Sequence, residues 1–129
     1  MLRTKVLRSV SARKDVQNLF NIYGLECDDI YLKHCDYVLG AYCDDVLVHC
    51  ATIINHKGDE FYLDYILGDV DTVNFLEIVV EFLTLKANSN VFSLYTITDN
   101  KKLIKELEKA YFMYETMDTY VRLCEVKCV

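Results

Sequence analysis

The chain has 129 residues, which is enough for one domain with a single core but leaves no room for a second domain. Apolar residues make up 53% of the chain and charged residues 26%, which excludes a disordered or low-complexity protein. Fourteen basic and twenty acidic residues give a net charge of −6, which argues against direct binding to nucleic acid or anionic lipid. We therefore expect one domain over residues 1–129.

We expect neither a membrane span nor a secretory signal in this sequence. No apolar run approaches the roughly 18 residues of a membrane span, and the basic start at residues 1–8 lacks the apolar stretch of a secretory signal. We expect an intracellular, cytoplasmic protein without membrane contact. A short, divergent domain suits a virus as well as a cell, and a viral chain would act in the host cytoplasm.

The six cysteines are expected to be free and mostly buried, because no Cys-x-x-Cys pair occurs and so apolar a chain does not need cross-links. His49 and Cys50 are neighbours on a predicted strand. Adjacent side chains of a strand face opposite sides, so these two cannot bind one metal ion together. We expect no metal site.

The first elements are a strand and two helices. The composition predicts a strand over Lys5–Val10, and Ser11 is a plausible N-cap for a helix over Ala12–Tyr23. Apolar residues in this helix recur at spacings of three and four, which indicates one buried stripe. A second, short helix is expected over Asp28–Lys33.

Three strands follow. Two β-rich runs at residues 38–42 and 46–54 are separated by an acidic tip at residues 43–45, a pattern typical of a hairpin. Turn-forming residues at 55–59 then precede a run at 61–67 that alternates between apolar and polar positions. The sequence therefore predicts a three-stranded antiparallel meander.

The next helix is predicted over residues 74–86, where Asn74 and Glu77 have the spacing of a capping box. This helix is apolar almost all round, so we expect a sheet to cover it. A buried strand over residues 91–98 comes next, and the helix should bridge two parallel strands.

The last elements are a helix and a strand. Asp99 or Asn100 can cap a helix that runs to Ala110 with lysines on its exposed face, and residues 116–126 are rich in β-formers. The elements together predict a mixed α/β (α+β) domain.

Two local motifs, with this order of elements, make the whole chain resemble the GNAT superfamily of acetyl-CoA-dependent N-acetyltransferases. Family hairpins often read acid-Gly-Lys-Leu-Val-Gly-small-Ala, and residues 44–51 read Asp-Asp-Val-Leu-Val-His-Cys-Ala. The family's last helix often reads Asn-x-x-Ala-x-x-x-Tyr-Glu-Lys-x-Gly-Phe, which this chain matches at Asn100, Glu108, Lys109 and Phe112. The resemblance implies a mostly antiparallel central sheet of about six strands, with about four helices on its two faces.

The resemblance also locates the cofactor site. Thr72, Phe75 and Glu77 stand where the family has Arg/Gln-x-x-Gly-x-Gly/Ala around the pyrophosphate of acetyl-CoA. Glycine lets backbone amides approach phosphate, so the Phe75 side chain is expected to obstruct this approach. A Glu77 carboxylate about 4 Å from phosphate would cost roughly 4 kcal/mol at an effective dielectric near 20, but about 1 kcal/mol in bulk water. Alternatively, Glu77 only caps the helix.

Further site positions follow from the family pattern. Backbone amides near Ile66 and Leu67 would hold pantetheine, and Asn100 matches the family's helix start. Leu107 replaces the tyrosine that protonates the departing thiolate, and Tyr111 lies one turn later as a substitute or as packing.

The resemblance also suggests a general base. Asp64, or Glu60, could deprotonate the amine substrate, or could simply be a solvated acid on the surface of a strand.

Two functions are consistent with these residues. The favoured hypothesis is a GNAT-fold protein whose acetyl-CoA site has eroded, so that it binds no cofactor and acts through a protein partner or a second copy of itself. The alternative is a divergent acetyl-CoA-dependent N-acetyltransferase that acetylates an amine of a protein or small molecule.

Overall fold

The computed structural model describes residues 2–58, 60–68, 72–87, 91–97, 113–117 and 120–126. Within these ranges the elements are β1 (Leu2–Val6), α1 (Val10–Ile22), α2 (Asp29–His34), β2 (Tyr37–Cys43), β3 (Val46–Lys57), β4 (Glu60–Leu67), α3 (Thr72–Lys86), β5 (Val91–Ile97), β6 (Met113–Met117) and β7 (Tyr120–Val126).

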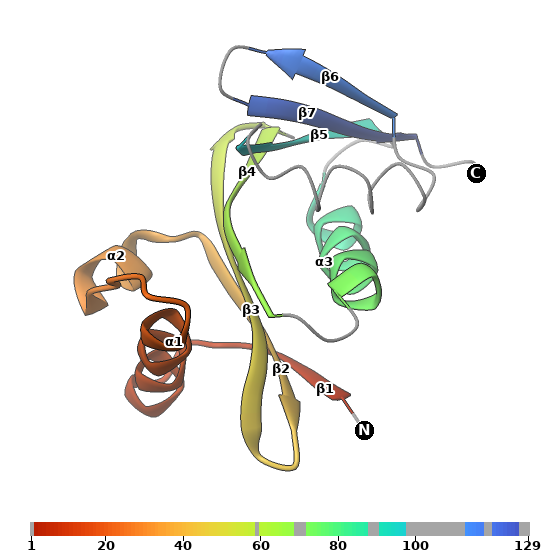
Figure 1. Ribbon diagram of the computed structural model, residues 1–129. Coiled ribbons are helices and arrows are strands. Elements are labelled where there is room, and N and C mark those ends of the chain that lie inside the picture. The colour runs from red at the N-terminus through yellow and green to blue at the C-terminus, as the bar shows by residue number, and fades with distance from the viewer. Residues whose placement is uncertain are drawn as a thin grey trace.

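The strands form one seven-stranded sheet in the order β1-β2-β3-β4-β5-β7-β6. Every neighbouring pair is antiparallel except β4 and β5, which are parallel and are connected through α3 (Figure 1). The mixed, mostly antiparallel fold class is therefore confirmed, as is the parallel pair on either side of the long helix.

The C-terminal run holds one strand more than the sequence analysis expected. Residues 116–126 were predicted as one strand, but β6 and β7 form an antiparallel pair in which Met117 is the partner of Tyr120. Both strands contain β-formers such as Tyr, Thr and Val, so composition alone does not show where the chain reverses. The helix predicted from Asp99 or Asn100 lies outside the described residues.

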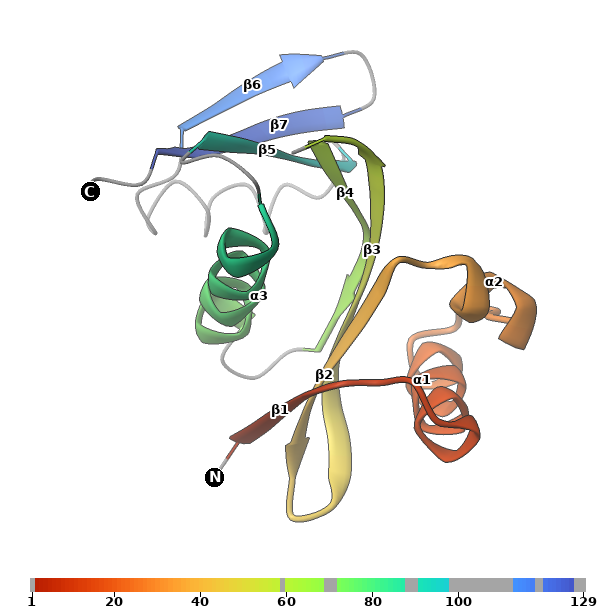
Figure 2. The same cartoon turned by 180° about the vertical axis from the view of Figure 1, so that it is seen from behind.

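Helices cover both faces of the sheet: α1 and α2 lie on one face and α3 on the other (Figures 1 and 2). Alternate residues of β2, β3 and β4 point to opposite faces and build two separate cores. The core under α3 includes Leu39, Ala51, Ile53, Phe61, Leu63, Phe75, Val79 and Leu83. The core under α1 and α2 includes Leu7, Val16, Leu19, Phe20, Leu32, Val38, Leu47 and Cys50.

Helix α1 begins earlier than predicted because its N-cap is Ser9 rather than Ser11. The Ser9 hydroxyl accepts a hydrogen bond of 3.0 Å from the backbone amide of Ala12, and β1 ends at Val6 rather than Val10. The buried stripe of α1 is confirmed, because the side chains buried along this helix are Val16, Leu19 and Phe20.

The predicted hairpins are present, with one change of length. Asp44 and Asp45 both have positive φ angles, of 50° and 66°, as a two-residue type I′ turn requires. Strand β3 runs to Lys57, which pairs with Glu60, so the second turn is shorter than the predicted 55–59.

Helix α3 begins at Thr72, two residues before its predicted start, so the capping-box prediction for Asn74 and Glu77 is wrong. Asn74 is inside the first turn, and Glu77 follows that turn and is exposed. The β-branched pair Thr72 and Val73 disfavours helix locally. Burial of the apolar α3 face against the sheet outweighs this preference.

None of the helices that the structure describes is both long and apolar enough to cross a membrane.

We predict that Ser9→Ala lowers the free energy of unfolding by about 1 kcal/mol, because it removes the N-cap acceptor of α1. Ser11→Ala is the matched control and should change stability by less than about 0.5 kcal/mol, since Ser11 is exposed within the helix. Urea denaturation followed by circular dichroism measures both values. A larger loss for Ser11→Ala would contradict the assignment of the cap.

Candidate functional site

A β-bulge at Asp64 shapes the centre of the sheet. Along the β3–β4 pair, Thr52 is the partner of Tyr65 and the next residue, Ile53, is the partner of Leu63. Asp64 is therefore the extra residue of β4. A bulge of this kind bends its strand and increases the local twist.

Strands β4 and β5 separate next to this bulge. They pair only where Glu60–Tyr62 run beside Ser93–Tyr95, while Leu63–Leu67 continue along β3 without a described partner on β5. Both figures show the end of β4 running beside β3, away from β5 (Figures 1 and 2). Because an unpaired strand edge presents backbone donors and acceptors, this part of β4 can bind an extended ligand.

The Asp64 side chain lies on the face of the sheet covered by α1 and α2, where it lines a pocket of about 180 Å³. The pocket combines three aromatic rings with three acidic side chains and one thiol. Its lining residues are Phe20, Glu26, Cys27, Asp28, Tyr31, Asp64 and Tyr65. A carboxylate beside aromatic rings in a small pocket is suited to a cationic amine.

A chain of hydrogen bonds orients the Asp64 carboxylate. The Tyr31 hydroxyl donates to Asp64 Oδ2 and lies 3.0 Å from Thr52 Oγ1, which in turn accepts from the Tyr65 amide at 3.1 Å. Since the single Tyr31 proton is used on Asp64, the Thr52 hydroxyl donates to Tyr31. Burial, and then the bond to Asp64, raise the pKa of Tyr31, so it stays a neutral donor at physiological pH.

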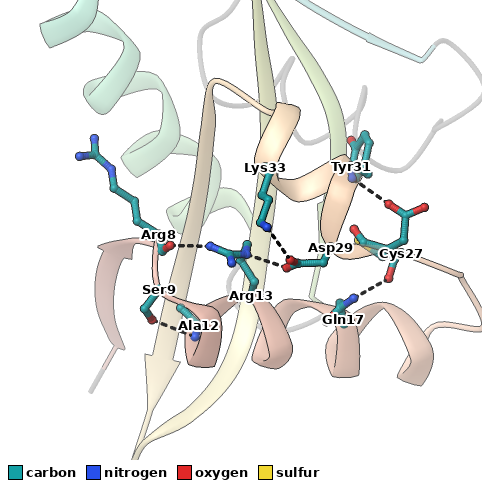
Figure 3. A network of polar contacts seen from close by, with 10 residues as sticks. Arg8, Ser9, Ala12, Arg13, Gln17, Cys27, Asp29, Tyr31 and Lys33 are labelled. Atoms are coloured by element: carbon teal, nitrogen blue, oxygen red, sulfur yellow. Dashed lines mark hydrogen bonds and ion pairs between the residues drawn. The ribbon is translucent and has the colours of Figure 1, made fainter.

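Side chains of α1 make polar contacts that hold α2, and with it the Tyr31 end of the hydrogen-bond network, in place (Figure 3). Arg13 of α1 donates to Asp29 of α2 at 2.6 Å and to the Arg8 carbonyl at 2.7 Å, while Gln17 donates to the Cys27 carbonyl at 3.1 Å. The Arg13 hydrogen bond holds the pKa of the Asp29 carboxyl below its ordinary value. These contacts position Tyr31, which lies in α2.

The thiol that lines the pocket, Cys27, is a poor nucleophile. Cys27, Cys35, Cys43 and Cys50 are free, as predicted, although only Cys50 among them is buried. Burial raises the pKa of Cys27 to about 11, so its sulfur is protonated at neutral pH. Because the thiolate is the reactive form, the pocket is not built for covalent catalysis by Cys27.

The first two turns of α3 contain the residues that were expected to obstruct a cofactor. The Phe75 side chain is fully buried in the α3 core, where its ring stacks on His49 with centroids 5.1 Å apart and an interplanar angle of 17°. Burial in the core directs the Phe75 ring away from the helix surface, and the obstruction of a cofactor by this residue stays a prediction. Glu77 is exposed on that surface, beyond the first turn.

Gly68, at the end of β4, packs closely on His49. Its φ is +126°, and a Cβ built there would lie 1.9 Å from His49 Nδ1, so no other residue fits without a shift. The glycine at the end of β4 lets the backbone pack directly on a buried side chain. Backbone close to the start of a helix is the kind of cradle that a diphosphate needs, so the residues present fit the family's cofactor in this respect.

The other predicted site residues lie on different parts of the fold. Ile66 pairs with Ala51 and Leu67 with Cys50, on the stretch of β4 that leaves β5. Thr72 is the first residue of α3. Asn100 and Tyr111, like Leu107, lie outside the described residues.

Three site residues were missed by the sequence analysis. Tyr31 is one of ten tyrosines, Thr52 is a β-former in a strand, and His49 was considered only as a metal ligand. No local pattern marks Tyr31 or Thr52, because their roles depend on a contact between α2 and β3 across 21 residues. His49 and Cys50 do face opposite cores, as predicted.

A larger cavity, of about 740 Å³, lies between β1, the start of α1 and the β2–β3 hairpin. Its lining mixes the cations Lys5 and Arg8 with the carboxylates of Asp15, Asp44 and Asp45. Opposite charges so close together favour no single charged ligand. The smaller pocket at Asp64 is therefore the stronger candidate site.

We predict that Tyr31→Phe lowers the free energy of unfolding by about 2 kcal/mol, because it removes the donor to a part-buried carboxylate and the acceptor for Thr52. Tyr37→Phe is the matched control, since the Tyr37 ring packs on Phe82. Its hydroxyl makes no hydrogen bond to the described residues, and we expect a change below about 0.5 kcal/mol. Equal losses in urea denaturation would contradict the assigned network.

We predict that Gly68→Ala costs on the order of 3 kcal/mol of stability, because the new methyl group adds a clash with His49 to the strain of the backbone. Gly24→Ala carries only backbone strain, about 1 kcal/mol, because nothing lies within 4 Å of its Cβ position at φ +72°. Thermal unfolding of both variants makes the comparison. A Gly68→Ala protein as stable as Gly24→Ala would disprove the close packing on His49.

No protein-family model matches this chain, and no curated protein matches it by sequence. Solved structures do match. Naa50 of Arabidopsis thaliana, solved with a bisubstrate analogue of coenzyme A, has a TM-score of 0.71 at 14% identity, covering 98% of this chain and 99% of its own. PseH of Campylobacter jejuni, solved with acetyl coenzyme A, also has a TM-score of 0.71, at 9% identity and with 99% and 100% coverage.

A third structure is the GNAT domain of PAT from S. lividans, with a TM-score of 0.72 at 13% identity, covering 98% of this chain and 90% of that domain. All three matches extend over nearly the whole of this chain, so they concern the complete arrangement of sheet and helices. The chain therefore has the fold of the GNAT N-acetyltransferases, as its hairpin and C-terminal motifs predicted.

Proposed function

We propose that this protein is a divergent N-acetyltransferase that takes acetyl-CoA as donor and an amine as acceptor. The observation that carries the proposal is the Asp64 carboxylate, placed by a bulge in a pocket beside the point where β4 and β5 separate. A general base for the amine and a strand edge for the donor thus come from the same segment of β4.

The donor would be held by two parts of the chain. The edge of Leu63–Leu67 can hydrogen-bond an extended pantetheine, and the amides at the start of α3 can face phosphate. Acetyl-CoA bound there would supply an acetyl group activated as a thioester. The Phe75 ring is buried in the core and Glu77 is exposed beyond the first turn, and both positions support a donor site at the start of α3.

The acceptor would be handled by the Asp64 pocket. A primary amine is protonated at neutral pH and must lose a proton before it can attack a carbonyl carbon. Asp64 can accept that proton directly or through one water molecule, while Tyr31 and Thr52 hold its carboxylate in a fixed orientation. Tyr31 remains neutral and therefore does not compete for the proton.

A second candidate function is a non-catalytic GNAT-fold protein that acts through a protein partner or a second copy. The observation in its favour is in the sequence: Thr72, Phe75 and Glu77 replace the family's phosphate signature, and Leu107 replaces its tyrosine acid. Under this alternative the chain uses no cofactor. The two candidates differ in one measurable property, which is binding of coenzyme A.

We predict that Asp64→Asn lowers kcat/KM for amine acetylation about 100-fold or more, the effect of removing a general base. Its Kd for coenzyme A should not change, because the amide oxygen of the substituted side chain would still accept the Tyr31 hydrogen bond. Glu60→Gln, on the same strand, is the matched control and should keep activity within about threefold. Release of the free thiol with a panel of peptide, lysine and polyamine acceptors measures the rates, and calorimetry measures Kd.

The control also decides between the two candidate bases. If Glu60→Gln loses activity and Asp64→Asn does not, the assignment of Asp64 is wrong. If the wild-type protein shows no heat of binding with millimolar acetyl-CoA, the acetyltransferase proposal fails. A stable complex with a partner or a second copy, seen by sedimentation, would then support the non-catalytic candidate.

A further inference from the structure

The pocket at Asp64 carries negative charge at two depths. Asp64 is half-buried, like the tyrosines Tyr31 and Tyr65 beside it, whereas Glu26 and Asp28 line the same pocket but are exposed and so lie at its mouth. Among the described residues that line the pocket there is no Lys, Arg or His. The proton transfer proposed above uses only Asp64, which leaves the two carboxylates at the mouth without a function.

Neither Glu26 nor Asp28 forms an ion pair within the described part of the chain. The cations nearest to them in the α1–α2 layer, Arg13 and Lys33, both pair with Asp29 instead, at 2.6 Å and 3.5 Å. Carboxylates without a cationic partner at the mouth of a pocket create a negative potential, and this potential attracts cationic ligands.

Tyr31 joins the two depths of the pocket. Its backbone amide donates to Asp28 Oδ1 at 2.8 Å, and its hydroxyl donates to Asp64 Oδ2. The carboxylate at the mouth and the carboxylate inside are thus bound to opposite ends of one tyrosine. A tyrosine side chain is about as long as a short alkyl chain, so a ligand with a cationic group at each end of such a chain matches both depths.

The walls between these carboxylates are aromatic. The Tyr65 ring meets Phe20 edge-on, with centroids 5.0 Å apart, and meets Tyr31 edge-on at 6.1 Å. Aromatic rings pack against methylene groups and attract ammonium groups. The volume of about 180 Å³ is smaller than the roughly 300–1,000 Å³ of pockets for drug-sized ligands, which favours a small aliphatic molecule.

We propose that the amine acceptor is a short aliphatic diamine, an inference that rests on the proposed function. One ammonium group reacts at Asp64, and the other keeps its charge between Glu26 and Asp28. The reacting nitrogen forms a bond to the acetyl carbon while the carbon–sulfur bond of the thioester breaks. Of the two protons that this nitrogen gives up, one passes through Asp64 to solvent, and the other ends on the thiol of coenzyme A.

The test uses three amines with the same number of carbon atoms. Putrescine ends in a second ammonium group, butylamine in a methyl group and γ-aminobutyrate in a carboxylate. At low ionic strength we expect a KM for putrescine about tenfold below that for butylamine, and a KM for γ-aminobutyrate about tenfold above it. Added salt should reduce these differences, because the carboxylates at the mouth are exposed. Release of the free thiol measures the rates.

A double variant removes the charge at the mouth. Glu26→Gln combined with Asp28→Asn should raise KM for putrescine about tenfold and change KM for butylamine much less, and the Asn still caps α2. Asp44→Asn combined with Asp45→Asn is the matched control, because it removes two charges from a hairpin outside the pocket and Asn tolerates positive φ. Its KM for putrescine should stay within about twofold of the wild-type value.

The outcomes separate this inference from the proposed function. Wild-type protein that acetylates no amine contradicts the proposed function, and the diamine inference with it. Protein that acetylates butylamine as efficiently as putrescine contradicts only the diamine inference. Equal effects of the two double variants on KM for putrescine do the same, as does a lysine peptide that is a better acceptor than putrescine.

Discussion

The extra residue in β4 is the constraint on which the candidate site depends. Because Asp64 has no partner on β3, β4 bends just beyond the three residues that it shares in parallel with β5. The same bulge puts Asp64 and Tyr65 on the α1–α2 face, where Asp64 meets Tyr31 and Tyr65 meets the Phe20 ring. One irregularity therefore exposes a strand edge and places a carboxylate in a pocket beside it.

The two layers of helices support the two halves of this site separately. On one face, Arg13 and Gln17 of α1 hold α2 so that the Tyr31 hydroxyl reaches β3 and β4. On the other face, Phe75 and His49 fix the start of α3 against the sheet. The pocket at Asp64 and the proposed donor site thus have independent cores, and the middle of the sheet separates them.

The core under α3 is also where local packing is least satisfied. His49, whose two ring nitrogens have no hydrogen-bond partner in the described ranges, and Gly68, which admits no Cβ, meet at the end of β4. A polar group left unpaired in a core costs roughly 1–3 kcal/mol.

Local patterns in the sequence determined most of the architecture. The apolar stripe of α1, the acidic type I′ turn at Asp44 and Asp45, the meander and the long apolar helix can each be predicted from the spacing of residue types, because these features depend on neighbours within a few positions. Asp64 was a candidate only through the resemblance to a family that often has an acid on this strand. Only the tertiary structure decided that it is the bulged residue, that Tyr31 reaches it from α2, and that the Phe75 ring points into the core. Each of these contacts joins segments far apart in the chain, so they follow from the packing of helices on the sheet rather than from any local pattern.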